Sequence, residues 1–487
     1  MRPFSLSHRP AQALSGSQPR TQPVDSRSSR LVGLLAPEFH RRNQELAVSS
    51  RADMLIDRRC TLGLSSLADE EAYVKFHWFH LMPYPYLPDR FRERYRSVWV
   101  DLPSELYDPV KGHEVYNTYL DELEFADQVG FDGICVNEHH QNGYGLMPSP
   151  NLMAASLARR TRNAKIVVLG NSVALYNPPT RVAEEMAMID VISGGRLIAG
   201  FPVGTNMDTA FCYGNNPATL REKYREGVEL ILRAWTVHEP FTFNGKYTQL
   251  RYVNVWPRPL QQPHPPVWIP GGGSVETWDY CINNDFLYAY LSYFGYKQAT
   301  KTMEGFWGAV ERLGAEPNPY RTGFLQMIAV ADSDAHAEEL YGEAALYFYN
   351  RCLNVYEGFR DAPGYTTLAT IRSGIRGAFH EAANAFDPTE LTWKDIVDRG
   401  YIIAGSADSV ADQMNDMADT LRAGHAMLLC HFGNLPKETV LYNTQRVAED
   451  VLPKVRHNFA GWEDRWFPSG TLSDAVEPAS LPSPAGA

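Results

Sequence analysis

The chain has few of the features that mark extracellular, membrane-spanning or nucleic-acid-binding proteins. Its six cysteines stand singly, with no CxxC pair, so neither a zinc knot nor a disulfide framework is predicted. No apolar run approaches the roughly 18 residues that span a bilayer. The formal net charge of −12 argues against a nucleic-acid partner, because neutralising phosphates needs a concentrated basic surface. We therefore expect a cytoplasmic protein that binds a small molecule and no membrane.

Both ends of the sequence are poor in the apolar residues that build a core. Residues 1–60 are rich in Arg, Ser and Pro and lack the apolar central region of a secretory signal. An organelle transit peptide is an alternative interpretation, as is a start of the chain at Met54. We predict a disordered N-terminal extension over residues 1–72, one folded domain over 73–459 and a disordered tail over 460–487.

Between these ends, short β-rich runs alternate with longer helical ones. The predicted strands cover 74–82, 131–138, 165–175, 196–204, 265–270, 285–292, 323–331 and 425–433. The first four are followed by predicted helices at 113–130, 150–161, 181–193 and 221–236. Strands that alternate with helical crossovers run parallel. The pattern predicts an α/β fold, a (β/α)8 TIM barrel with insertions, in preference to a doubly wound sheet.

Two insertions interrupt the alternation. Residues 240–256 read as a β-hairpin, because Asn244 and Gly245 form a typical turn pair between two β-rich runs. Residues 350–400 contain no clear strand, and we predict a helical excursion before the last strand.

Three titratable residues, Glu138, His139 and His140, stand side by side where the second predicted strand ends. The carboxyl ends of barrel strands carry the chemistry of this fold. Alternation along an extended chain sends Glu138 and His140 one way and His139 the other, so adjacent histidines do not easily chelate one ion.

We favour an acid–base site at these residues, because imidazole suits proton transfer near neutral pH. A metal site completed by His80 or His431 is a second interpretation, which no HxH or HExxH spacing supports. A polar loop with satisfied histidines is the third.

A glycine run, Gly271 to Gly273, and Ser274 follow the fifth predicted strand and precede a helix. Free backbone N–H groups at a helix N-terminus bind anions, so this loop is a candidate phosphate site. A glycine run is as often a plain turn, and the sequence has neither a GxGxxG fingerprint nor a Walker lysine.

Three stretches together resemble the bacterial luciferase-like, flavin-dependent monooxygenase family. They are EHH at 138–140, LYNPPTRVAEEMAMIDVISGGRLIAGFPVG at 175–204, and the glycine loop; the similarity spans about residues 74–457. The resemblance implies a barrel that binds reduced FMN delivered by a separate NAD(P)H-dependent flavin reductase. It further implies that O2 forms a C4a-peroxyflavin, which inserts one oxygen atom into a small organic substrate. Homo-oligomers, dimers or tetramers, are expected.

The resemblance also implies roles for single residues. His139 matches the acid–base group beside the reactive flavin face, with Glu138 and His140 next to it. Asn171 and Ser172 match the support of the ring, and the Ser172–Val173 bond matches a non-proline cis peptide. The remaining matches concern the flavin phosphate and the pyrimidine edge: Val203, Gly204, Thr205, Gly271, Gly272, Gly273, Ser274 and Tyr293. Aromatic residues after the first strand, such as Trp78 and Tyr84, are expected to keep the pocket dry.

One departure from the family pattern concerns the phosphate. Val203 stands where luciferase carries an arginine, so the phosphate charge would rest on hydroxyls such as Thr205 and Ser274 or on a basic residue elsewhere. The deazaflavin F420, used by a dehydrogenase on the same barrel, is therefore an alternative cofactor. A flavin-binding protein without catalysis and a zinc hydrolase are further alternatives, and the substrate is not predicted.

Overall fold

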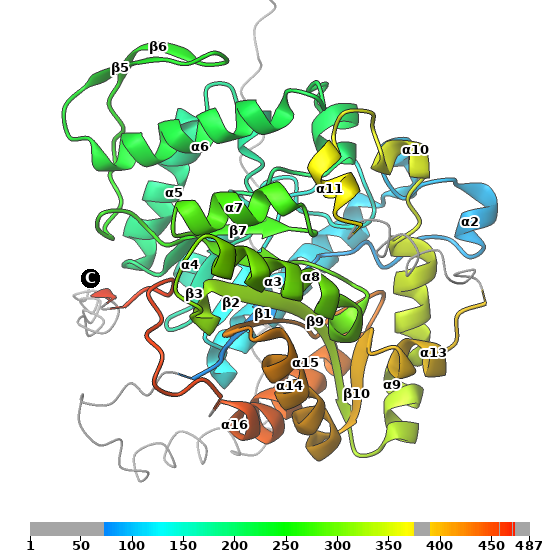
Figure 1. The fold of residues 1–487 in the computed structure, drawn as a ribbon. Helices are drawn as coiled ribbons and strands as arrows, with labels where there is room; N and C mark the ends of the chain where they lie inside the picture. The colour runs from blue at the N-terminus through cyan, green and yellow to red at the C-terminus, as the bar shows by residue number, and fades with distance from the viewer. Residues whose placement is uncertain (1–72, 375–389, 457, 470, 473–487) are drawn as a thin grey trace, which may run out of the picture. The chain divides into compact units, whose positions relative to one another are not determined.

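The computed structural model describes residues 73–374, 390–456, 458–469 and 471–472 (Figure 1). These residues belong to one compact unit, Glu70–Ala487. The extension predicted over residues 1–72 and the tail beyond residue 472 lie outside the described residues.

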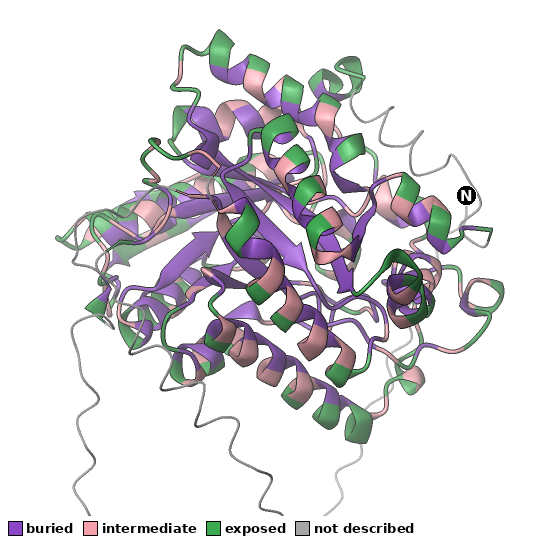
Figure 2. Cartoon of the chain, turned by 90° about the horizontal axis from the view of Figure 1, so that it is seen from below, coloured by how far each residue is buried: buried purple, intermediate pink, exposed green. Residues whose placement is uncertain are grey.

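Eight parallel strands close into a barrel. In order around the ring they are β1 Lys75–Phe79, β2 Gly133–Val136, β3 Lys165–Val168, β4 Leu197–Gly200, β7 Val267–Gly271, β8 Leu287–Tyr290, β9 Thr322–Ala331 and β11 His425–Leu429. Pairing of β11 with β1, which sets His425 opposite Lys75, closes the ring. The predicted (β/α)8 barrel is confirmed, and Figure 2 shows the strands buried inside a layer of helices with exposed outer faces.

Helices follow the strands as the alternation predicts. The longer ones are α3 Pro109–Val129, α4 Pro150–Arg160, α5 Thr180–Ser193, α6 Leu220–Thr236, α7 Val275–Asn283, α8 Gly295–Arg312, α9 Asp334–Tyr347, α14 Ala407–Leu421 and α15 Lys437–Arg446. The shorter ones are α2 Phe91–Arg94, α10 Glu357–Arg360, α11 Leu368–Arg372, α13 Trp393–Asp398 and α16 Leu452–Val455. The helix α3 starts earlier than predicted, because the Asp108 side chain accepts hydrogen bonds from the amides of Val110 and Lys111.

Several strands are shorter than predicted at their carboxyl ends. The ladder of β2 ends at Val136, that of β3 at Val168 and that of β4 at Gly200. The apolar run continues because the loops at the barrel mouth are buried as well, as Leu169 and Val173 illustrate. Hydrophobic patterning reports burial and not backbone hydrogen bonding, so the predicted strands include residues of the buried loops at the barrel mouth.

The insertions are partly as predicted. Strands β5 Phe241–Asn244 and β6 Gln249–Val253 form the expected antiparallel hairpin. The sequence analysis missed β10, Ile402–Ser406, which lies outside the ring and pairs with the far half of β9, Met327–Ala331. Its short apolar run cannot be distinguished from a buried helical turn by periodicity.

The chain beyond residue 459, assigned to the tail by the sequence analysis, packs against the barrel over its described part. Trp466 is buried; its indole N–H donates to the carbonyl of Asp285, and its own carbonyl accepts from the indole of Trp268. The ring of Phe467 lies near those of His77 and His425. These aromatic residues give the segment the apolar content that residues 473–487 lack.

Candidate active site

Each of the two adjacent histidines is hydrogen-bonded to its own carboxylate. The Nδ1 atom of His139 lies 3.1 Å from Oδ2 of Asp208, and Nε2 of His140 lies 3.1 Å from Oε1 of Glu138. Both histidines follow β2 in a loop, yet their side chains have different partners, in keeping with the alternation expected of them. The predicted Glu138 and His140 therefore act as a pair, and His139 belongs to a different one.

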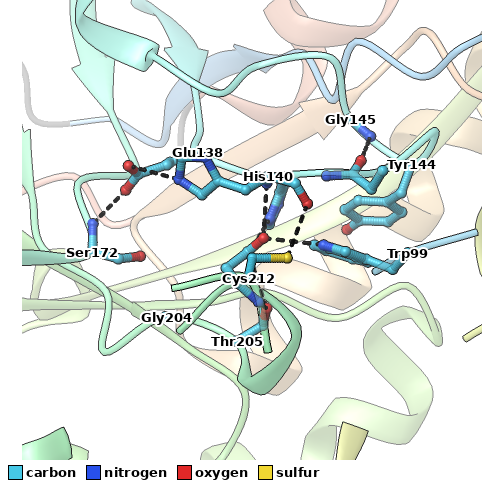
Figure 3. Close-up of polar contacts among 12 residues, drawn as sticks. Trp99, Glu138, His140, Tyr144, Gly145, Ser172, Gly204, Thr205 and Cys212 are labelled. Atoms are coloured by element: carbon cyan, nitrogen blue, oxygen red, sulfur yellow. Dashed lines mark hydrogen bonds and ion pairs between the residues drawn. The ribbon is translucent and has the colours of Figure 1, made fainter. Parts of the chain in front are cut away.

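Glu138 ties the end of β2 to the end of β3 (Figure 3). Its carboxylate accepts hydrogen bonds from the backbone N–H of Ser172 at 2.6 Å and from the hydroxyl of Tyr176 at 2.6 Å. Burial, and then the Glu138 charge, raise the pKa of Tyr176, so its hydroxyl remains a donor. The other ring nitrogen of His140 lies 3.2 Å from the hydroxyl of Tyr213. This buried network fixes the loop that carries His139.

Asp208 is one functional candidate that the sequence analysis missed. Its side chain is 2% exposed and lies on a π-helical turn, Met207–Cys212, soon after β4. Turns of this kind are frequent at functional sites. Oδ1 accepts from the indole of Trp99 at 3.0 Å and from the amide of His140 at 2.8 Å. The sequence offers only an aspartate in a loop without periodicity, which is no signal of such a role.

Aromatic side chains enclose the ring of His139. The rings of Trp99 and Tyr144 are stacked at 4.7 Å, and both meet His139 edge-on. The hydroxyl of Tyr144 lies 2.5 Å from that of Tyr293. The side chain of His139 is 16% exposed and that of His140 is 7% exposed, so His139 is the more accessible of the two.

The aromatic enclosure was predicted at different residues. Trp78 donates from its indole to Thr444 on α15, and Tyr84 packs against Tyr86 and Tyr107. The enclosure comes instead from Trp99 in the loop after β1 and Tyr144 in the loop after β2. The amide of Val100 donates to the carbonyl of Gln141 and that of Gly143 to the carbonyl of Val98, which pairs the two loops. Trp99 reaches His139 through this pairing.

The residues predicted to support a planar ring lie at the ends of β3 and β4. Asn171 and Ser172 are buried, and Asn171 accepts a hydrogen bond from Asn151 at 2.9 Å. Gly204 has a φ of +91°, and a Cβ there would lie 2.8 Å from Oγ of Ser172, so a larger residue does not fit. The Ser172–Val173 bond is trans, contrary to the prediction, and Val173 starts a short 3-10 turn whose amide at Leu175 donates to Ser172.

The predicted residues that follow β4, Val203 to Thr205, have different contacts. Val203 is buried and offers only an apolar side chain. Thr205 donates its hydroxyl to Asp208 at 2.9 Å, so it belongs to the His139 pair. The carbonyl of Gly204 accepts from the hydroxyl of Tyr365 at 2.7 Å.

The glycine loop lies between β7 and α7, and a positively charged side chain, that of Arg221, contacts it. The guanidinium of Arg221, at the start of α6, donates to Oγ of Ser274 at 2.8 Å, and its buried Nε has no hydrogen-bond partner among the described residues. Open space faces Gly272, where a Cβ would meet no atom within 4 Å. Gly273 has a φ of +90°, and its amide donates to Tyr288. Backbone, hydroxyl and guanidinium donors that converge in this way suit a phosphate.

His80 and His431, offered as ligands in the metal interpretation, form a separate cluster with Glu122 of α3. Oε2 of Glu122 lies 2.7 Å from Nδ1 of His431 and 3.2 Å from Nε2 of His80, and all three residues are buried. The amide of Met82 donates to Nδ1 of His80, so the ring proton is on Nε2. A metal ion would need the lone pair of Nε2, so this hydrogen-bonding pattern does not fit a metal ligand at His80.

The family model for luciferase-like monooxygenases matches residues 98–423, which include both histidine pairs and the glycine loop. The chain belongs to this family. Proteins that are similar to this chain in sequence are flavin-dependent monooxygenases. The oxygenase component of a flavin-dependent trigonelline monooxygenase from Acinetobacter baylyi is 28% identical over 243 residues, 49% of this chain and 65% of that protein.

Two further similarities cover most of the barrel. The 2,5-diketocamphane 1,2-monooxygenase 1 of Pseudomonas putida is 23% identical over 363 residues, 70% of this chain and 94% of that protein. The oxygenating constituent of a Pseudomonas putida 3,6-diketocamphane monooxygenase, solved with FMN, superimposes with a TM-score of 0.60 at 19% identity over 78% of this chain and 99% of that one. The last comparison shows the shared fold. Among the described residues, no helix has the length and apolar character needed to cross a membrane.

Proposed function

We propose that this luciferase-like protein is the oxygenase of a two-component system, which receives reduced FMN from a separate NAD(P)H-dependent reductase and oxygenates a small organic substrate. The observation that supports it most is the pairing of an enclosed, partly accessible His139 with Asp208 at the mouth of a flavin-family barrel. Reduced flavin, when bound, supplies the electrons that activate O2. In this proposal His139 holds and returns a proton, and Trp99 and Tyr144 exclude water.

We assign the FMN phosphate to Gly272, Ser274 and Arg221. Val203 removes the cation expected after β4, and Arg221 supplies one from the start of α6. The carboxylate of Glu276 in the first turn of α7 would repel a phosphate, but the hydroxyls of Thr367 and Thr370 hydrogen-bond it. The Arg221 guanidinium is then the charge that favours FMN over riboflavin.

The first experiment decides between flavin and F420. Oxygen uptake with chemically reduced FMN is compared with reduction of F420 by candidate alcohols, and hydrogen peroxide is measured with and without substrates such as trigonelline and 2,5-diketocamphane. We expect oxygen uptake with FMN and less peroxide when a substrate is oxygenated. Reduction of F420 without oxygen uptake would replace the proposal with a dehydrogenase.

The second experiment tests the phosphate assignment. Arg221→Met should weaken FMN binding by about tenfold or more and leave riboflavin binding unchanged, because a hydrogen bond to a charged group contributes about 1.5–3 kcal/mol. Arg225→Met, which removes an exposed arginine one helical turn later, is the matched control. Gly272→Asp should abolish FMN binding through like-charge repulsion. Equal losses for FMN and riboflavin in Arg221→Met would exclude the assignment.

We further propose that the oxygenase forms a homodimer through α4 and α5. Leu152 on α4 and Met188, Val191 and Ile192 on α5 are exposed apolar side chains on two helices that pack together. Apolar patches of this kind mark interaction sites. Val191→Glu combined with Leu152→Glu should shift the mass measured by light scattering to that of one chain. The five free cysteines of the described residues suit a reducing compartment, and we propose the cytoplasm.

A further inference from the structure

We propose that Asp208 is a positioning residue that holds the ring of His139 as its Nδ1–H tautomer and keeps Nε2 as the proton acceptor. The catalytic part of this inference rests on the proposed function. Its structural part concerns only the hydrogen bonds of Asp208, and it stands independently of any cofactor.

Four hydrogen bonds reach the Asp208 carboxylate, and together they determine the direction of the one that involves His139. The indole N–H of Trp99 and the amide N–H of His140 are obligatory donors at Oδ1. The hydroxyl of Thr205 donates to Oδ2 at 2.9 Å. These three donors take three of the about four acceptor positions of a carboxylate, and a carboxylate carries no proton of its own to donate at the fourth. The fourth contact, from Nδ1 of His139, must therefore be an N–H that donates.

The tautomer of a neutral imidazole is fixed once one nitrogen is known to donate. With the proton on Nδ1, Nε2 carries the lone pair, and the structure gives Nε2 no hydrogen-bond partner among the described residues. Gly145 lies close to another edge of the ring, since a Cβ there would lie 3.3 Å from Cδ2 of His139. Ring position and tautomer are thus set by the protein before any ligand binds.

Asp208→Asn is a sharp test because it preserves shape and most hydrogen bonds. The indole of Trp99 and the amide of His140 require an acceptor, so the asparagine oxygen must take the place of Oδ1. Its NH2 group then faces Thr205, whose hydroxyl can accept, and Nδ1 of His139. Both donations to Oδ2 are lost: the Thr205 hydroxyl can rotate and accept instead, but Nδ1 of His139 can accept only if the ring proton moves to Nε2.

The readout is the 15N spectrum of the full-length, flavin-free protein with labelled histidine, in which His139→Gln identifies the His139 signals. We expect the Nδ1–H tautomer in the wild type and the Nε2–H tautomer in Asp208→Asn. Asp190→Asn is the matched control. It changes a buried aspartate of α5 that accepts a hydrogen bond from Gln261, and it should leave the His139 signals unchanged. An Nε2–H tautomer in the wild type, or an unchanged tautomer in Asp208→Asn, would overturn the inference.

Activity then separates this inference from the proposed function. With reduced FMN, Asp208→Asn should lower product formation by about 10²-fold while FMN binding stays close to wild type. Tautomer inversion in a protein that forms no oxygenated product with reduced FMN would leave the positioning role standing and exclude the oxygenase. Tautomer inversion with full oxygenase activity would exclude the catalytic use of Nε2.

Discussion

Two histidine–carboxylate groups in this barrel have similar chemistry and opposite surroundings. At the mouth, His139 binds Asp208, and its side chain keeps 16% of its surface exposed. On α3, Glu122 accepts a hydrogen bond from His431, and Nε2 of His80 lies 3.2 Å from the same oxygen; no side chain of this triad is more than 2% exposed. The triad is enclosed by aromatic rings of Trp78 and Tyr119.

The difference teaches that solvent access, more than residue type, separates a reactive group from a structural one. Burial lowers the pKa of His80 to about 4, although Glu122 opposes the shift, so this ring is neutral at physiological pH. Burial would raise the pKa of Glu122, but the neighbouring His431 and His80 outweigh it and lower that pKa to about 2. The triad ties the ends of β1 and β11 to α3, whereas the mouth pair leaves Nε2 of His139 without a hydrogen-bond partner among the described residues.

The largest expected effect is on stability, at the buried triad. Glu122→Met should destabilise the fold by about 3 kcal/mol or more, because the buried imidazole of His431 loses its acceptor and that of His80 loses the carboxylate beside it. Glu122→Gln should cost less, since its amide oxygen can still accept from His431. Urea unfolding followed by circular dichroism measures the difference, and equal stability of all three proteins would contradict the structural role.

The second effect is on chemistry, at the mouth. His139→Ala should lower product formation by about 10²-fold or more with near-normal FMN binding and unfolding, the usual scale for losing a positioned acid–base group. Reduced FMN should still consume oxygen, but hydrogen peroxide should replace product because the missing ring admits water. His140→Ala should affect turnover less, and a reversed ranking would show that His140 is the reactive ring.

The third effect, which is absent at neutral pH and develops only in acid, is the pH dependence of stability. The folded pKa values of His80 and Glu122 lie below the ordinary values of 6.5 and 4.5, so the unfolded chain binds more protons in acid. The contribution of His80 is complete above pH 6.5 and is lost as pH falls to about 4; that of Glu122 is lost between 4.5 and about 2. The melting temperature should therefore decrease as the pH is lowered from 6.5.

A matched variant isolates the contribution of His80 to this decrease in melting temperature. His80→Asn keeps an acceptor for the Met82 amide and removes the titrating ring, so the decrease between pH 6.5 and 4 should be smaller than in the wild type. The same decrease in both proteins would show that other groups dominate.

Local patterns predicted the barrel and the location of the candidate site residues. Strand and helix periodicity indicated the eight strands and the first four helices, and Glu138, His139, His140 and the glycine loop lie at carboxyl ends of strands as expected. The missed strand β10 and the overlong strand ends share one cause, because a short apolar run reports burial and not hydrogen bonding.

By itself, the sequence determined the (β/α)8 architecture and the family, since periodicity and motif residues are local properties of the chain. Tertiary structure alone decided which carboxylate each histidine meets and which arginine accompanies the glycine loop. Asp208 lies 69 residues from His139, and Arg221 lies 53 residues from Ser274. Loops without a repeat bring these partners together, and their conformation depends on packing across the barrel mouth, which no local pattern encodes.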